Sequence, residues 1–496
     1  MLPPLRLFIP RLEQSMSDAP IEYPEIPSTL TGRFNWRMLK YFGAGAILAS
    51  VTIGSGETLM ASRGGSIFGY SVLWAVLLAS AAKAIQVYTA ARHMTLTGRH
   101  PLEDWGRITR WIPWLLLGLS LWCFPFLLSF LSLVLGEIIN EMFHVAAPDD
   151  PNFRHWTRIW ATGATVLAIT LTLIQGYGVM EKVQTAVIGL LLLSIGAACL
   201  ASNPEWLAVI EGLFVPVSPR YEPWLIEKYP DKFAGRTAWV EITTIIGFVG
   251  GGTYDYLGYI GCLREKSWGA IGSAPSDASA VTIADNADNL KRGHTWLRPP
   301  CIDVTTSFVC VFVFSVCFVV LGASVLHPKE IVPAKNGELL THQAQFLTQI
   351  HPTFLYLYRI GVFMAFWGTI YGAYEIYWRT VYECLRPVSE QVRQMSPKKV
   401  RLYVLLYCGI GGIALSWLTE NPIELITIPS LIGGVLTCGL WCFGMMWLDR
   451  TILPKPLRMK APLLIATMLS GVLLTAIGAK ALYDFADAFV RRLPGI

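Results

Sequence analysis

The sequence predicts an all-α polytopic membrane protein with about eleven transmembrane helices. Of its 496 residues, 53% are hydrophobic and only 15% are charged, and the mean hydropathy is +0.48. These values are far more apolar than those of a soluble protein of this size. Apolar stretches of helical length recur along the chain, and two of them are interrupted by glycine clusters.

The first interruption, Gly54 to Glu57, divides the apolar stretch that runs from Gly43 to Arg63. Two glycines, a serine and a carboxylate at mid-depth weaken or unwind a helix. A membrane tolerates the freed amide and carbonyl groups only where protein buries them or where they line a polar cavity. We therefore expect a substrate site here, and the alternative is a flexible kink.

The sixth span repeats this feature, because three consecutive glycines open the segment from Gly250 to Asp255. Two glycine-interrupted spans five helices apart are typical of inverted repeats whose broken helices face each other at the membrane midplane. Close helix packing is the other use of such glycines. An acidic residue beside each cluster favours a site, since an ionisable group in mid-membrane is costly and usually functional.

The two interruptions define the candidate substrate site. The expected substrate-binding residues are Gly54, Ser55, Glu57, Gly251, Thr253, Tyr254 and Asp255.

Hydropathy divides the chain into spans of helical length. We expect them at 41–67, 71–92, 112–142, 158–175, 184–202, 239–263, 301–326, 354–383, 401–418, 422–447 and 461–484. Residues 41–484 then form the transmembrane domain, with one repeat at 41–202, a second at 239–447 and an extra helix at 461–484. Residues 1–40 form an N-terminal segment and 485–496 a C-terminal tail.

The distribution of basic residues predicts the orientation. With the N-terminus inside, the inner segments hold about 25 Lys and Arg and the outer segments about 11, as the positive-inside rule requires. We therefore expect a multi-pass protein of the cell membrane with a cytoplasmic N-terminus and an outer C-terminus. The N-terminal segment has no short apolar core followed by a small-residue cleavage site, so we expect no cleaved signal peptide.

Lys83 lies about midway along the second span, where an unpaired ammonium is costly and too deep to reach the interface easily. Its expected partner is a carboxylate, with Glu57 first and Asp255 or Asp303 next. A tethered ammonium could then replace a bound Na⁺ or proton. The alternative is a purely structural ion pair.

Enzyme and cofactor signatures are missing from the sequence. It contains no Walker loop, HExxH motif, nucleophile elbow or kinase signature, so we expect neither an enzyme nor a cofactor. The ten cysteines lack CxxC spacing and the eight histidines lack metal-ligand spacing. The net charge of +5 is modest and does not indicate nucleic-acid binding.

From Gly54 through Gly69-Tyr70 and Leu73-Trp74 to Arg92, the chain resembles without a gap the start of the Nramp (natural resistance-associated macrophage protein) divalent-metal transporters. The resemblance extends more weakly to the Ile-Ile-Gly entry of span six and to the span count. It implies a LeuT-like fold, which is a five-plus-five inverted repeat with broken helices one and six.

The metal-site motifs of that family are not preserved. Its Asp-Pro-Gly-Asn, which supplies two metal ligands, falls on Gly54 to Glu57, and its Met-Pro-His falls on Gly251 to Thr253. The soft thioether that helps select transition metals is therefore absent. The apolar Leu128 and Leu131 fall near its proton-carrying acids. The resemblance implies the fold without the metal site or the proton path.

We expect an Nramp-like secondary-active transporter of a cation, with specificity diverged from transition metals. Oxygen ligands, with Glu57 as the candidate metal ligand, suit a hard cation such as Mg²⁺. Carboxylates with aromatic neighbours suit an organic amine or amino compound instead. A non-transporting membrane receptor that retains the fold is the alternative of a different class.

The expected partners are the lipid bilayer and a small cation or small organic substrate, with no nucleic acid. Span eight supplies possible site walls, although ordinary helix packing or an interface belt would explain the same stripe. These residues are Trp367, Thr369, Tyr371, Tyr374, Glu375 and Trp378.

Overall fold

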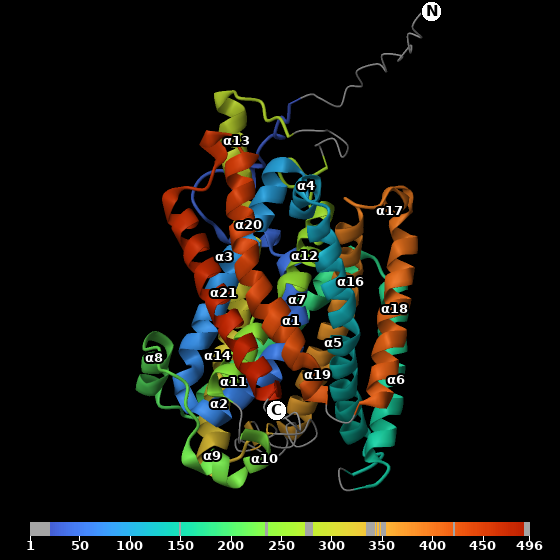
Figure 1. Cartoon of the computed structure of the whole chain (residues 1–496), viewed down its shortest axis with the longest axis vertical. Helices are drawn as coiled ribbons and strands as arrows, with labels where there is room; N and C mark the ends of the chain where they lie inside the picture. The colour runs from blue at the N-terminus through green and yellow to red at the C-terminus, as the bar shows by residue number, and fades with distance from the viewer. Residues whose placement is uncertain are drawn as a thin grey trace, which may run out of the picture.

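The computed structural model describes residues 20–147, 150–233, 237–272, 281–333, 354–419 and 422–490, together with positions 343, 345, 346 and 348. Long helices that run roughly side by side form the body of the molecule (Figure 1). Some of these helices are made of consecutive shorter segments. In chain order the segments are α1 (Ala44–Thr52), the π-helix η4 (Ile53–Ala61), α2 (Ser62–Phe68), α3 (Leu73–Thr97), α5 (Trp111–Phe143), α6 (Phe153–Ile174), α7 (Tyr177–Ala201), α11 (Ala238–Phe248), α12 (Thr253–Cys262), α14 (Arg298–Leu321), the π-helix η7 (Gly322–Leu326), α16 (Phe354–Leu385), α18 (Pro397–Leu418), α19 (Pro422–Pro429), the π-helix η9 (Ser430–Leu436), α20 (Thr437–Thr451) and α21 (Ala461–Val490).

Short helices lie at the two ends of this bundle (Figure 1). We call the upper end the α13 end, and it carries α4 (Pro101–Ile108), α13 (Ala287–Trp296) and α17 (Glu390–Gln394). The lower end, the α9 end, carries α8 (Trp206–Phe214), α9 (Pro223–Lys228) and α10 (Pro230–Phe233). The described chain begins at the α13 end, where the Ile21 amide donates to the Thr282 carbonyl at 2.7 Å, and α21 runs toward the α9 end (Figure 1).

Within the described part of the chain, each of the expected spans coincides with one or more helices. Eight of the described helices are long and apolar enough to cross a membrane. The shorter pieces, such as α11 and α12, combine across an interruption to reach spanning length, as a broken transmembrane helix does. The expected count of eleven crossings and the boundaries of the two repeats stay predictions.

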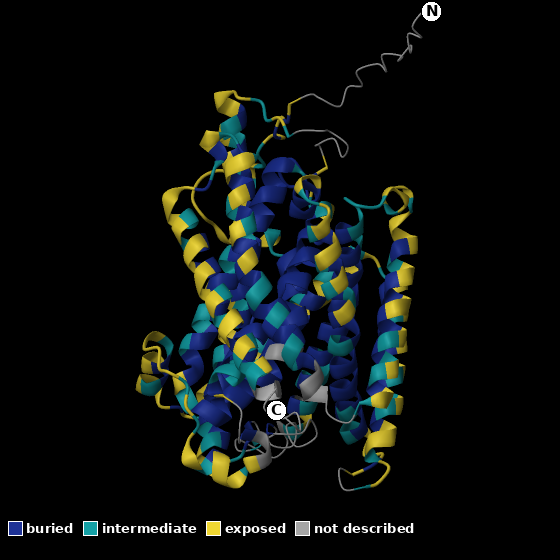
Figure 2. Cartoon of the chain, in the orientation of Figure 1, coloured by how far each residue is buried: buried dark blue, intermediate teal, exposed yellow. Residues whose placement is uncertain are grey.

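The buried centre of the molecule holds the two interrupted spans. Every residue of α1 and of α12 is buried, whereas α6, α18 and α21 carry exposed stripes on the outside (Figure 2). Those stripes are apolar, for example Ile410 on α18, which is 67% exposed, and Leu469 on α21, which is 53% exposed. A bilayer would cover such faces, because lipid is as apolar as these side chains.

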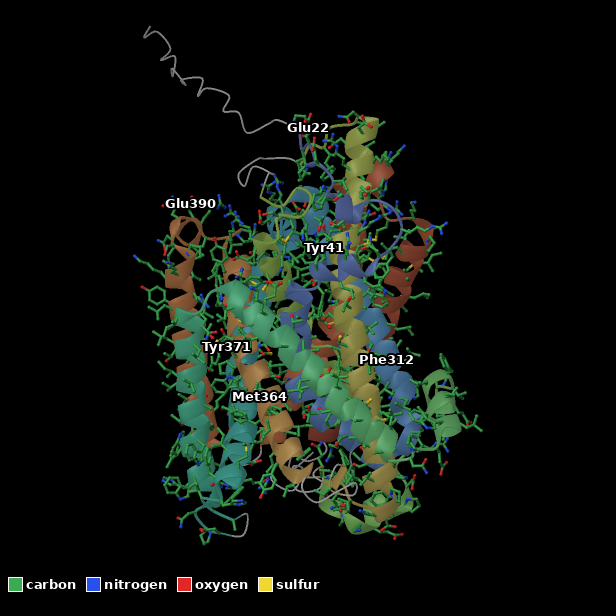
Figure 3. The ribbon with its side chains drawn as sticks, turned by 180° about the vertical axis from the view of Figure 1, so that it is seen from behind. Glu22, Tyr41, Phe312, Met364, Tyr371 and Glu390 are labelled. Atoms are coloured by element: carbon green, nitrogen blue, oxygen red, sulfur yellow. The ribbon has the colours of Figure 1, made fainter. Side chains whose placement is uncertain are left out.

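Small residues let the central helices approach closely. An added Cβ on Gly65 of α2 would lie 2.1 Å from the Val319 carbonyl oxygen of α14, and one on Gly322 of η7 would lie 2.2 Å from the Ser62 carbonyl oxygen. Close backbone contact of this kind is a main source of helix association in membranes. Seen from behind, α7 crosses this region obliquely, in contact with α1, α14 and α16 (Figure 3).

The close contact at Gly65 predicts a selective effect of added volume. Gly65→Ala should destabilise the protein by about 1 to 3 kcal/mol, because the methyl group must displace backbone of α14. Gly118→Ala is the matched control, since Gly118 also lies within a helix and nothing lies within 4 Å of its added Cβ. Thermal unfolding of the two purified variants in detergent measures the difference. Equal midpoints would contradict the packing described here.

Candidate functional site

The sixth span is broken between α11 and α12, as the glycine cluster predicts. The α11 helix ends at Phe248 and α12 begins at Thr253. Between them Gly250 and Gly251 have φ angles of +79° and +82°, which side chains other than glycine rarely adopt. An added Cβ on Gly250 would also lie 2.9 Å from a ring carbon of Phe308. Both conformation and space therefore require glycine at this break.

The interruption of the first span takes a different form. The α-helical pattern changes to the π-helix η4 after Thr52 and returns at Ser62, without an extended segment. The Gly54 amide donates to Thr369 Oγ1 of α16 at 3.0 Å. An added Cβ on Gly54 would lie 2.1 Å from the same oxygen. The expected interruption of the first span is therefore a π-helical segment, in which the helix is locally wider.

The two interruptions meet at Glu57. This side chain is fully buried, and its Oε1 accepts from the Gly250 amide at 2.9 Å. In a continuous α-helix that amide would donate to the carbonyl of Ile246, four residues back. The Ile246 carbonyl accepts instead from Lys83 Nζ at 2.7 Å. The donor and the acceptor of one lost helical hydrogen bond are thus each satisfied by a charged side chain.

Lys83 donates to backbone carbonyls rather than to a carboxylate. Its fully buried Nζ lies 2.7 Å from the Ile246, Val249 and Gly251 oxygens and 3.0 Å from the Gly247 oxygen. We call these four oxygens the carbonyl cage. The C-terminal end of a helix carries partial negative charge and unpaired carbonyls, so it attracts an ammonium.

The expected direct ion pair of Lys83 with Glu57 is therefore wrong. The two side chains contact the same break at different groups. Glu57 accepts from the Gly250 amide, and Lys83 donates to the Ile246 carbonyl. Asp303 is also not the partner, because its carboxylate accepts from the amides of Gly43 and Gly45 and from the Tyr259 hydroxyl. Asp255 Oδ2 accepts from the Gly252 amide at 2.8 Å and so caps the start of α12.

A central pocket lies beside the break, and residues of both interrupted spans contribute to its lining. The space that the centre of a water-sized molecule can occupy in it is ≈ 40 Å³. The lining residues are Val51, Thr52, Leu127, Phe130, Leu131, Gly247, Phe248, Gly251, Gly252, Tyr254, Asp255, Tyr377, Ser430 and Gly434. Asp255 is the one ionisable carboxylate among these lining residues, and its buried Oδ1 has no hydrogen-bond partner. The pocket therefore offers a single anionic oxygen within largely apolar walls.

The predicted site residues divide into three groups. Gly251, Tyr254 and Asp255 line the central pocket. Gly54, Glu57 and Thr253 lie outside that lining and hold the interruptions together, with Thr253 Oγ1 accepting from Thr437 Oγ1 at 2.9 Å. The Ser55 side chain lies outside the described part of the structure.

Two walls of the pocket come from residues that the sequence analysis did not select. Tyr377 is the lining residue from α16, whereas the six expected residues of that span lie elsewhere. Glu375, for example, pairs with Arg379 and Arg401, each at 2.9 Å. The second wall, Ser430 and Gly434, belongs to the π-helix η9. The glycine pair at 433 and 434 beyond a helical proline is a signal that could have identified it.

Metal ligation has little support around Glu57. In the part of the chain that the structure describes, no group of three or more His, Cys, Asp or Glu could hold a metal ion. The four oxygens of the carbonyl cage accept hydrogen bonds from Lys83. The role of Glu57 as a metal ligand therefore stays a prediction.

Ion pairs close the bundle at the α13 end. Arg264 pairs with Glu383 of α16 and with Glu103 of α4, each at 2.6 Å. Burial alone would lower the pKa of the Arg264 guanidinium, but the two carboxylates raise its pKa above the usual range. These charge-assisted hydrogen bonds of Arg264 link α4 to α16 at this end of the molecule.

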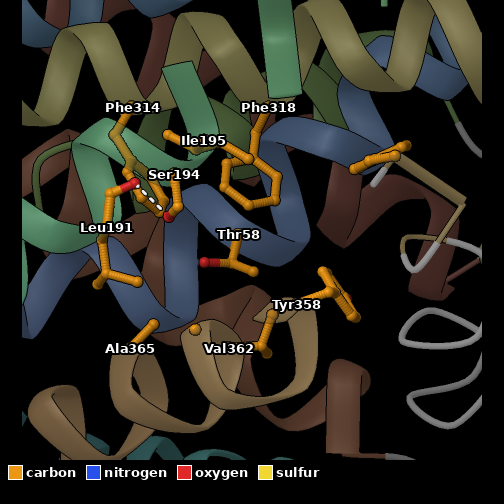
Figure 4. Close-up of a pocket in the computed structure, with 11 residues that line it drawn as sticks. Thr58, Leu191, Ser194, Ile195, Phe314, Phe318, Tyr358, Val362 and Ala365 are labelled. Atoms are coloured by element: carbon orange, nitrogen blue, oxygen red, sulfur yellow. Dashed lines mark hydrogen bonds between the residues drawn. The ribbon is translucent and has the colours of Figure 1, made fainter. Parts of the chain in front are cut away.

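A second cavity is lined by residues of η4, α7, α14 and α16 (Figure 4). Its empty volume is ≈ 430 Å³, and Thr58 faces Phe314, Phe318 and Tyr358 across it. None of the residues that line it is charged. This cavity is therefore a poor candidate for a cation site.

Comparisons with known proteins agree with this architecture. The family described as "Natural resistance-associated macrophage protein-like" matches residues 45–484. Over 194 residues, 37% of this chain, the sequence is 28% identical to "Metal transporter Nramp3" of Oryza sativa subsp. japonica. Over 207 residues, 40% of this chain, it is 25% identical to "Protein Malvolio" of Drosophila melanogaster. The aligned segments span 32% and 33% of those two relatives.

Solved structures are similar over nearly the whole chain. The Eremococcus coleocola manganese transporter, solved in complex with an aromatic bis-isothiourea substituted compound, matches with a TM-score of 0.65 at 15% identity, over 98% of this chain and 93% of that one. The nucleobase-cation-symport-1 family transporter MHP1, with bromovinylhydantoin bound, matches with a TM-score of 0.51 at 14% identity, over 90% and 91% of the two chains. At these identities the likeness shows the fold.

The contact between Glu57 and Gly250 predicts different effects for two substitutions of similar size. Glu57→Gln keeps an acceptor for the Gly250 amide, whereas Glu57→Met leaves that buried amide unpaired at a cost of about 1 to 3 kcal/mol. Thermal unfolding in detergent should therefore give a lower midpoint for Glu57→Met than for Glu57→Gln. If the methionine variant is the more stable of the two, the hydrogen bond does not support the break.

Proposed function

The chain belongs to the natural resistance-associated macrophage protein-like (Nramp) family, and from this premise we propose that it is a secondary-active membrane transporter that carries a cation through the central pocket. The observation that supports this is the unpartnered Oδ1 of Asp255, which lies between two interrupted spans. An ionisable oxygen without a partner at this depth is costly, so it is retained for a ligand.

The charges around the pocket favour a substrate with one positive charge. Asp255 is the one carboxyl group that lines the pocket, so it can balance one positive charge on a substrate. Lys83 also places an ammonium on the carbonyls that a metal ion would otherwise use. A divalent ion would meet both electrostatic repulsion and a shortage of ligands. We therefore propose that the specificity has diverged from that of the metal-transporting relatives.

An organic ammonium compound is the specific candidate that the pocket walls favour. Phe130, Phe248 and Tyr377 line the pocket with Asp255. Aromatic and apolar surfaces stabilise an organic cation by apolar contact and by cation–π attraction, while one carboxylate pairs with its charge. A hydrated Mg²⁺ ion would instead need several oxygen groups facing it.

The orientation that we propose places the α13 end in the cytoplasm. The basic residues counted as internal lie on or beside helices of that end, such as Arg107 on α4, Lys291 on α13 and Lys398 at the start of α18 (Figure 1). Segments rich in Lys and Arg remain on the cytoplasmic side of a membrane.

Transport should depend on the charge of Asp255. Asp255→Asn keeps an oxygen for the Gly252 amide but removes the negative charge, so binding of a cation should weaken about 30-fold or more. The measurement is uptake of labelled small amines into proteoliposomes under proton and Na⁺ gradients. Asp288→Asn is the control, because Asp288 is an exposed acid on α13.

Two results would contradict the proposal in different ways. Unchanged uptake by Asp255→Asn would remove this carboxylate from the substrate path. Ligand binding to the wild type without uptake under any gradient would favour a receptor that retains the fold.

Metal binding should be weak and unselective. Because the pocket offers no thioether and one carboxylate, Mn²⁺ should bind no more tightly than Mg²⁺. Isothermal titration calorimetry of the purified protein with each ion compares the two affinities, and an organic ammonium series titrated under the same conditions provides the positive comparison. A strong preference for Mn²⁺ would contradict the proposed divergence.

A further inference from the structure

We propose that the carbonyl cage is a monovalent-cation site and that the Lys83 ammonium is its permanent, covalently attached occupant. The cage is formed by the carbonyl oxygens of Ile246, Gly247, Val249 and Gly251, and Nζ lies 2.7 to 3.0 Å from each. The chain therefore needs no free Na⁺ or K⁺ at this break. This inference does not depend on which substrate the central pocket carries.

The number and kind of the oxygens support a cation site. An ammonium has three N–H donors, yet four carbonyls surround Nζ, so at least one proton is shared between two oxygens. Convergence of backbone oxygens in excess of the donors is how proteins replace the hydration shell of an alkali ion. Unwound carbonyls and helix C-terminal ends bind coupling cations in broken-helix transporters for the same reason.

Features other than Lys83 also hold this arrangement. The positive φ angles of Gly250 and Gly251 turn the chain at the cage. Tyr256 Oη donates to the Gly250 carbonyl at 2.8 Å, and the Gly250 amide is held by Glu57. Removal of the lysine side chain would therefore leave a preformed group of electron-rich oxygens deep in the protein, with room where the side chain lay. Uncompensated carbonyls in such a place favour uptake of a small cation.

The expected consequence is a change in cation dependence. In choline chloride, Lys83→Ala should unfold at a lower temperature than the wild type. Na⁺, K⁺, NH₄⁺ or ethylammonium at equal ionic strength should restore most of the lost midpoint, and the effect should saturate as mass action requires. The wild type should show no saturable stabilisation by Na⁺ or K⁺. Because choline and ethylammonium are organic ammonium ions of the class proposed for the central pocket, the series is repeated in an Asp255→Asn background, where that pocket lacks its carboxylate.

Two matched variants separate cation binding from packing. Lys83→Met fills the space of the side chain without its charge, so it should be destabilised and should not respond to small cations. Ser80→Ala lies one turn earlier on α3 and is also buried, and it should behave like the wild type. If Lys83→Ala folds only when a small cation is present during purification, that result also supports the site.

Three results would overturn the proposal. The first is a Lys83→Ala protein as stable in choline as the wild type. The second is a destabilised Lys83→Ala protein that none of the four cations rescues, or one that fails to fold in all of them while Lys83→Met folds. The third is a saturable dependence of wild-type stability on Na⁺ or K⁺. The wild-type measurement can overturn the proposal even if no lysine variant can be purified.

Discussion

A helical hydrogen bond missing in the buried interior is the constraint on which the centre of this molecule depends. Lipid cannot satisfy a free amide or carbonyl, so an interrupted helix needs partners from other helices. The Gly250 amide donates to Glu57 of the first span, and the Ile246 carbonyl accepts from Lys83 of the second. Three segments far apart in the sequence are joined by this requirement. The central pocket lies beside the joint because the glycines leave space there.

The interruption of the sixth span could be predicted from the sequence, because glycine acts locally on backbone conformation. The same holds for the positions of the helices, since an apolar run of spanning length is a local property. The partner of Lys83 could not be predicted. A sequence displays carboxylates as candidate partners, whereas backbone carbonyls become available only when a particular helix ends beside the ammonium.

The walls of the pocket were harder to predict for a related reason. Tyr374, Tyr377 and Trp378 lie within one and a half turns of α16, and only Tyr377 faces the pocket. Which of them does so depends on the rotation of the helix about its axis, and that rotation is set by packing against several neighbours. Ser430 and Gly434 follow the same rule, because η9 reaches the pocket through its contact with α11.

The π-helices η4 and η9 both border the centre, with Glu57 inside one and Ser430 at the start of the other. A π-turn closes between residues five apart, whereas an α-turn closes between residues four apart. If one residue of such a segment returns to α spacing, everything beyond it rotates by about 100° and advances about 1.5 Å. A change from π to α spacing in either segment would therefore rotate side chains at the centre without unfolding a helix end.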